Sequence, residues 1–248
     1  MSPAKVLRRA HRGILVAVVA TLVSTLGVLA YRALPANRVE SRASSYDIGE
    51  WVSPPSLSTM FDYQPTLLAV ADTSTSFYPD LVANAMGWKL LLDAQGGTGF
   101  VRGADNPSSP RAPFIDRLDR DAATYYVDNV LVDGGRNDLD EPPERVLTAA
   151  GQYLKKVHSI WPFVKIVIVL PAAFTPDVAP NYQAVAEGLR RAAESVGAYA
   201  IDPLAQQWYR DVDVAQLLSK DGRHLNDAGE VYYAQKIVDN LKQLGLAS

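Results

Sequence analysis

The segment from Asp221 to Gly229, Asp-Gly-Arg-His-Leu-Asn-Asp-Ala-Gly, places a carboxylate three residues before an imidazole, in front of a predicted helix. Of the three histidines, only His224 stands beside a carboxylate in a loop. A carboxylate that orients an imidazole is the base half of a nucleophilic hydrolase site. Asn226 is expected to cap the helix that follows, whose positive end favours a neutral imidazole ready to accept a proton. An ordinary capped surface loop is the alternative interpretation.

Three further polar segments each follow a short apolar run that is typical of a buried parallel strand. They are Asp72-Thr-Ser-Thr-Ser76, Gly96-Gly-Thr-Gly99 and Gly134-Gly-Arg-Asn-Asp138. Open α/β sheets place their chemistry at the carboxyl ends of the strands, so we expect these segments to lie together. The hydroxyls supply a nucleophile, and the amide of Asn137 is placed to donate to an oxyanion. Glycine-rich turns with Asn and Asp as ordinary turn formers are the alternative.

In chain order, four segments resemble the four blocks of the SGNH (GDSL-type) hydrolase family. They are Ala71-Asp-Thr73, Gly96-Gly-Thr-Gly99, Gly135-Arg-Asn-Asp138 and Asp221-Gly-Arg-His224, and the resemblance covers about residues 64–246. The resemblance implies hydrolysis or transfer of an ester-linked acyl group within a flavodoxin-like α/β/α fold built on a five-stranded parallel sheet. It also implies that Asp221 orients the base His224, and that Gly97 and Asn137 form the oxyanion hole.

The first block departs from the family pattern of Gly-Asp-Ser, because Ala71 replaces the glycine and Thr73 the nucleophilic serine. Thr73 is the position-matched nucleophile, although its methyl group restricts χ1 and crowds the approach of an acyl carbon. Ser74 is the alternative nucleophile. Two functions therefore stay open. One is an esterase or acyltransferase acting on lipids or envelope carbohydrates, and the other is an impaired SGNH-like domain that binds an envelope ligand or a partner protein.

The N-terminal segment predicts a membrane anchor. Residues 1–12 carry four basic and no acidic side chains, and residues 13–31 are uncharged. As a helix, this uncharged stretch spans ~28 Å, close to the ~30 Å hydrocarbon core of a bilayer. We expect residues 1–12 to be cytoplasmic, 13–31 to cross the membrane, 32–63 to form a linker and 64–248 to form an exported hydrolase-like domain. Cleavage after Ala30, which would release a secreted protein, is the alternative.

Composition excludes several kinds of site. The chain has no cysteine, so thiol nucleophiles, disulfides and cysteine-based metal sites are excluded. No phosphate-binding or dinucleotide-binding fingerprint is present, and no cluster of His and acidic residues has metal-ligand spacing, so we expect neither cofactor nor metal. The whole chain carries −3 and residues 1–12 contribute +4, so the remainder carries −7. This balance argues against nucleic-acid binding and favours a neutral or cationic substrate.

Apolar periodicity predicts strands at 66–71, 88–93, 126–132, 165–170 and 198–202. Helices are predicted near 78–87, 114–121, 142–160, 181–197 and 227–244. Such alternation predicts a parallel sheet with helices on both faces. Thr73, Gly97, Asn137 and His224 should then converge at its carboxyl edge. Arg136, inside the third block, is expected to be a solvated charge, and contact with the substrate is the alternative.

Overall fold

The computed structural model describes residues 63–246, apart from 74–76, 104–110 and 173–178, and these residues belong to one compact unit, Ser56–Ser248. Five strands form one parallel sheet in the order β2-β1-β3-β4-β5. They are β1 (Thr66–Ala71), β2 (Lys89–Ala94), β3 (Asn129–Asp133), β4 (Lys165–Val169) and β5 (Tyr199–Ile201). This is the flavodoxin-like order, in which the winding reverses between β1 and β3 and leaves a crevice at the carboxyl ends of the strands.

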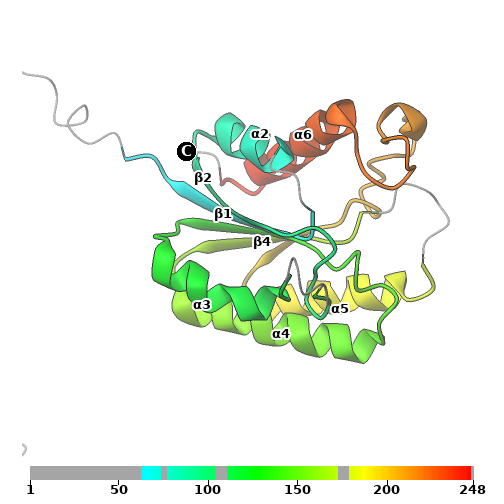
Figure 1. The fold of residues 1–248 in the computed structure, drawn as a ribbon. Helices are drawn as coiled ribbons and strands as arrows, with labels where there is room; N and C mark the ends of the chain where they lie inside the picture. The colour runs from blue at the N-terminus through cyan, green and yellow to red at the C-terminus, as the bar shows by residue number, and fades with distance from the viewer. Residues whose placement is uncertain (1–62, 74–76, 104–110, 173–178, 247–248) are drawn as a thin grey trace, which may run out of the picture. The chain divides into compact units, whose positions relative to one another are not determined.

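Helices cover both faces of the sheet, as the alternating sequence pattern predicts (Figure 1). One face is covered by α2 (Phe77–Met86) and α6 (Asp227–Gln243). The other is covered by α3 (Phe114–Thr124), α4 (Pro143–Ile160) and α5 (Tyr182–Glu194). The predicted three-layer α/β/α architecture with five parallel strands is therefore confirmed.

Side chains of the central strands alternate between the two cores. In β3, Val130 and Val132 pack toward α3, α4 and α5, whereas Leu131 packs toward α2 and α6. In β4, Ile166 packs toward α3, α4 and α5, and Val167 packs toward α2 and α6. Because both faces of the sheet are covered, these strands are continuous apolar runs without polar alternation.

Several strand boundaries differ from the sequence-based expectation, most by a single residue, and local hydrogen bonds explain two of them. β3 begins at Asn129 instead of residue 126, because the Asp128 carboxylate accepts from the backbone N–H and the hydroxyl of Thr66, each at 2.8 Å. β5 ends at Ile201, because the Asp202 carboxylate turns back to accept from the next backbone N–H groups, including that of Ala205 at 2.9 Å. Side chains that bind nearby backbone groups in this way compete with strand pairing.

The expected membrane helix, residues 13–31, and the expected linker, residues 32–63, lie outside the described residues except for Tyr63. Within the part of the chain that is described, no helix combines the length and the apolar character that a bilayer crossing requires. The predicted topology and localisation are untested by these observations.

Candidate active site

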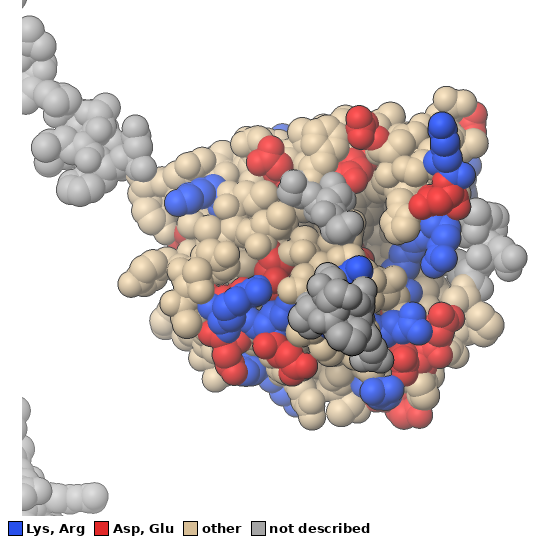
Figure 2. Space-filling model, in the orientation of Figure 1, with Lys and Arg blue, Asp and Glu red and all other residues tan. Residues whose placement is uncertain are grey.

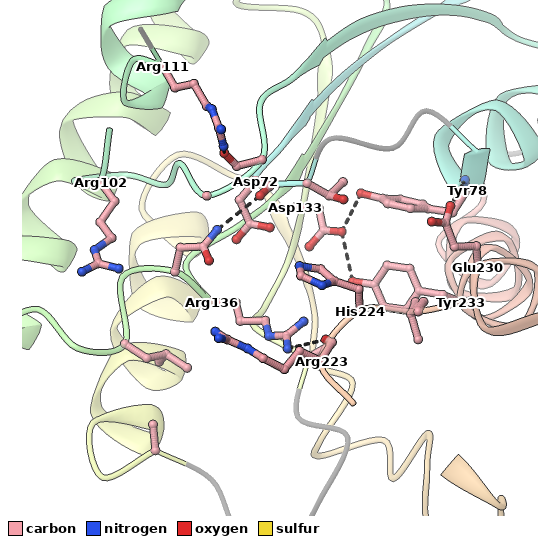
Figure 3. Close-up of a pocket in the computed structure, with 18 of the residues that line it drawn as sticks. Asp72, Tyr78, Arg102, Arg111, Asp133, Arg136, Arg223, His224, Glu230 and Tyr233 are labelled. Carbon is pink, nitrogen blue, oxygen red and sulfur yellow. Dashed lines mark hydrogen bonds between the residues drawn. The ribbon is translucent and has the colours of Figure 1, made fainter. Parts of the chain in front are cut away.

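The loops that leave β1, β2 and β3 surround a cavity of about 720 Å³ at the carboxyl edge of the sheet (Figure 3). The parallel arrangement puts these loops together although they come from distant parts of the chain. The cavity is lined by four of the residues that the sequence singled out, which are Thr73, Gly97, Asn137 and His224. The expected convergence is therefore present in the structure, and the chemical role of each residue stays a prediction.

The carboxylate of Asp221 holds the imidazole of His224 at its Nδ1 atom. Its Nδ1 lies 2.6 Å from Oδ2 of Asp221, and the other carboxylate oxygen accepts from the backbone N–H of Arg223 at 2.9 Å and of His224 at 3.0 Å. The bond to the imidazole, supported by the two backbone N–H groups, lowers the pKa of Asp221. An ionised carboxylate only accepts hydrogen bonds, so the neutral imidazole carries its proton on Nδ1 and leaves Nε2 as a base.

The loop that carries His224 is fixed at both of its ends. Asn226 caps α6 as predicted, since its side-chain oxygen accepts from Gly229 N–H at 2.9 Å. Its amide nitrogen donates to the carbonyls of Gln216 and Leu218, at 2.9 and 3.0 Å. A Cβ at Gly229 would overlap the backbone of the preceding segment, so only glycine lets the helix start this close to it.

Thr73 lies two residues beyond the end of β1 and lines the cavity, partly exposed. Ser74, the alternative nucleophile, lies outside the described residues. The choice between the two hydroxyls is therefore a prediction that the structure does not test.

The two expected oxyanion donors meet at one oxygen atom. The Gly97 N–H and the Asn137 side-chain amide both donate to the carbonyl oxygen of Asp72, at 3.1 and 3.2 Å. The amide of Asn137 also donates to the Thr98 carbonyl at 3.0 Å. Two donors that converge on one oxygen are what an oxyanion hole requires. In this structure the oxygen belongs to the chain itself. The neighbouring Gly96 also lines the cavity, and its N–H meets no acceptor among the described residues.

The wall beside His224 holds a carboxyl that sequence reasoning missed. Asp133, the last residue of β3, accepts from the hydroxyls of Tyr78 at 2.5 Å and Tyr233 at 3.1 Å (Figure 3). Burial raises the pKa of Asp133 to about 6, although both tyrosine hydroxyls oppose the shift. The two rings come from α2 and α6 and pack edge to face, with their centroids 5.1 Å apart. The sequence signals Asp133 only as a polar strand end and gives no sign of the two tyrosines.

Arg136 is not simply a solvated charge, contrary to the expectation. Its guanidinium donates to the carbonyl of Arg223 at 2.6 Å and thereby ties the third block to the loop of His224. It also lowers the pKa of Asp72 and of Asp133, although desolvation of the two carboxyl groups, the larger effect, raises both. The expectation failed because the sequence does not show that the two loops face each other.

Within the described ranges, no three or more His, Asp or Glu side chains lie together in a way that could hold a metal ion.

Comparisons with known proteins find relatives of this chain in sequence and in fold. A sequence model described as the GDSL-like Lipase/Acylhydrolase family matches residues 58–231. A GDSL lipase of Mycobacterium tuberculosis, Rv0518, is 32% identical over 111 residues, which are 44% of this chain and 47% of the relative. The match thus spans about half the length of that lipase.

Solved structures share the fold at low sequence identity. One is Est24, a carbohydrate acetylesterase from Sinorhizobium meliloti, with a TM-score of 0.55 and 15% identity over 73% of this chain and 100% of that chain. Another is the psychrotrophic esterase EstA from Pseudoalteromonas, with a TM-score of 0.57 and 17% identity over 73% of this chain and 98% of that chain.

Proposed function

Because the chain belongs to the GDSL-like lipase/acylhydrolase family, we propose that it cleaves an ester bond in the cavity at the carboxyl edge of its sheet. One observation carries the proposal. The imidazole of His224, held 2.6 Å from Asp221, lines the same cavity as Thr73. A base, its orienting carboxylate and a hydroxyl in one cavity are the parts that acyl transfer through a covalent intermediate requires.

In the proposed reaction, the hydroxyl oxygen of Thr73 attacks the ester carbonyl while Nε2 of His224 takes the hydroxyl proton. The negative charge that develops on the carbonyl oxygen is stabilised by Asn137 and the backbone N–H groups of the glycine loop. Loss of one such donor raises the barrier by about 3 kcal/mol in comparable sites. His224 then gives its proton to the departing alcohol, and a water molecule, deprotonated by the same nitrogen, releases the acid from the acyl-enzyme.

The lining of the cavity supports a short acyl group on a polar carrier. Among the described residues, few apolar aliphatic side chains line it, namely those of Leu139, Ala172, Ala179 and Leu225. A long acyl chain needs a continuous apolar wall, because each methylene left in water forgoes about 0.8 kcal/mol of burial. The predicted substrates are esters of lipids and of envelope carbohydrates. Among these, the lining favours short-chain esters of a polar carrier.

We also propose that residues 64–248 act outside the membrane, anchored by residues 13–31. The support is the basic flank and the uncharged span of the sequence. Protease added to intact spheroplasts should digest the domain, and complete protection of the full-length chain would refute this topology.

One observation favours the non-catalytic alternative, a domain that binds an ester or a partner without turnover. The carbonyl of Asp72 takes the hydrogen bonds of Gly97 and Asn137 that the oxyanion would need. Catalysis therefore requires the Asp72 carbonyl to turn away or to share these donors when substrate enters.

A fluorophosphonate probe separates the two functions, because it labels an activated hydroxyl and leaves a merely exposed one unlabelled. We expect the full-length protein to be labelled and to hydrolyse 4-nitrophenyl acetate, and His224→Ala to lose both. His158→Ala is the matched control, since His158 is exposed on α4, and it should keep both. If no protein, including Thr73→Ser, is labelled or hydrolyses the ester, the binding function is the correct one.

A further inference from the structure

One wall of the cavity is basic, although residues 13–248 carry a net negative charge. Four lining residues are arginines, namely Arg102, Arg111, Arg136 and Arg223. Figure 3 shows them on the side of the cavity away from the rings of Tyr78 and Tyr233. In Figure 2, basic side chains border the hollow on the visible face. The charge of this wall therefore favours an anionic group, whereas the net charge of the chain favours a neutral or cationic substrate.

Two of these arginines serve the protein itself. Arg136 donates to the Arg223 carbonyl, and Arg111 donates to the carbonyl of Gly96. Both side chains are therefore needed to hold the loops that surround the cavity.

The other two guanidiniums are available to a ligand. The side chain of Arg223 forms no hydrogen bond or ion pair with any described residue, and its backbone bonds do not depend on the side chain. Among the described residues, the nearest carboxylate partner of Arg102 is Glu141, at 3.8 Å. Glu141 is bound more closely by Arg145, at 2.8 Å. Arg102 and Arg223 thus line the cavity with most of their donors unused by the described residues.

Four acidic residues also line the cavity, namely Asp72, Asp133, Asp140 and Glu230. Asp133 accepts from the hydroxyls of Tyr78 and Tyr233, and Glu230 accepts from the backbone N–H of Tyr78 at 2.9 Å. Burial raises the pKa of Asp72, which favours its neutral form. Among the described residues, neither Arg102 nor Arg223 forms an ion pair with any of these four acids, so both charges stay available to an anion in the cavity.

We propose that the substrate ester carries an anionic group, a carboxylate or a phosphate, which Arg102 and Arg223 bind while the ester carbonyl lies between Thr73 and His224. The guanidinium fork matches both anions and binds them through paired, charge-assisted hydrogen bonds. A cavity of about 720 Å³ has room for an ester and such a group together. The inference rests on the proposed function and adds the chemical class of the substrate.

Matched esters test the inference in the full-length protein. On the acyl side, mono-4-nitrophenyl adipate is compared with 4-nitrophenyl hexanoate. On the alcohol side, 4-acetoxybenzoate and 4-acetoxyphenyl phosphate are compared with methyl 4-acetoxybenzoate. We expect kcat/KM to be at least about tenfold higher for a charged ester than for its neutral partner, and the ratio to fall as salt rises from 20 to 500 mM, since screening weakens exposed charge pairs. The favoured ester identifies the anion and the side of the ester that carries it.

Substitutions show whether the two arginines cause the preference. Arg223→Gln and Arg102→Gln should each lower the charged-to-neutral ratio about threefold or more, and together bring it near one. Arg191→Gln is the matched control, because Arg191 lies exposed on α5 and pairs only with Glu187. Its ratio should equal that of the wild type. A wild-type ratio near one, or a ratio that both Gln substitutions leave unchanged, overturns the inference.

Binding measurements keep this inference separate from the proposed function. Calorimetry with phenyl phosphate and benzoate, using phenol as the neutral probe, should detect binding of an anion that Arg223→Gln weakens. If the anion binds in this way but no ester is hydrolysed, the proposed function fails and the anion site stands. If neutral esters are hydrolysed and no anion is preferred or bound, the function stands and the anion site is refuted.

Discussion

The carboxylate of Asp138 should contribute several kcal/mol to folding, because it organises the glycine loop from inside the protein. Asp138 is fully buried. One of its oxygens accepts from the backbone N–H of Phe100 at 2.7 Å, and the other accepts from those of Arg102 at 2.9 Å and Val101 at 3.2 Å. The bonds hold the stretch that follows Gly97 against the third block.

Asp138→Asn preserves the shape of the side chain and removes one acceptor. In either orientation of the amide, its NH₂ group faces at least one of the three backbone N–H groups. A lost charge-assisted bond contributes about 1.5–3 kcal/mol, and a buried N–H left unpaired adds about 1–3 kcal/mol. Relaxation of the loop recovers part of this, so we expect a loss of about 3 kcal/mol in the free energy of unfolding, with reduced ester hydrolysis.

Urea denaturation of the full-length protein, followed by circular dichroism and tryptophan fluorescence, measures this loss. Asp119→Asn is the matched control, since Asp119 is 79% exposed and pairs with Lys156 on the surface. It should change the stability by less than about 0.5 kcal/mol. An equally small change in Asp138→Asn would refute the reasoning.

Gly99→Ala tests the same bonds from the other side. A Cβ at Gly99 would overlap the carboxylate of Asp138, so this substitution must displace the same acceptor. Two substitutions that break one set of bonds are not additive. The double variant should be little less stable than the worse single variant, and strict additivity would contradict the assigned role of Asp138.

Three further predictions concern the cavity. His224→Ala should abolish ester hydrolysis without unfolding the protein, and Asp221→Asn should lower kcat by a smaller factor, because it misorients the base without removing it. Thr73→Ser should raise kcat and Thr73→Ala should abolish it, with Ser74→Ala nearly unchanged; the reverse pattern would assign the nucleophile to Ser74. Asp133, with its pKa raised to about 6 by burial, holds its proton in the folded state at a pH where the unfolded chain has lost it. Stability should therefore fall by up to about 3 kcal/mol between pH 4 and 6, and Asp133→Asn should flatten that part of the pH–stability curve measured by urea titration.

The parallel sheet was predictable because its strands carry their signal locally. β1 was predicted at 66–71 and begins and ends there, and the apolar run that predicted β4 lies between two covered faces. Boundaries were less predictable where a polar side chain turned back on the backbone, as at Asp128 and Asp202. Such bonds depend on which backbone groups come within reach, and a periodic pattern carries no information about that.

The convergence of the expected site residues was predictable where those residues follow strands. Thr73, Gly97 and Asn137 each lie just beyond a strand, and the parallel topology then brings them to one edge. The Asp133–Tyr78–Tyr233 cluster was not predictable, because it depends on how two helices that are far apart in the sequence, α2 and α6, are rotated about their axes when they pack. The arginine wall depends in the same way on loops that face one another across the cavity.

The first block departs from the family pattern at Ala71 and at Thr73, and the structure shows that these two replacements differ in their consequences. Ala71 is 1% exposed within β1, where it is paired on one side with Ala94 and on the other with Asp133. Its φ is not positive, and the ladder continues past it, since the Asp72 N–H donates to the Asp133 carbonyl at 3.1 Å. A Cβ therefore fits at this position without strain, and the glycine is not needed for the turn. If Thr73 is the nucleophile, as we predict, the departure that bears on catalysis is its extra methyl group, which crowds the approach of the acyl carbon and leaves the Asp221–His224 pair as it is.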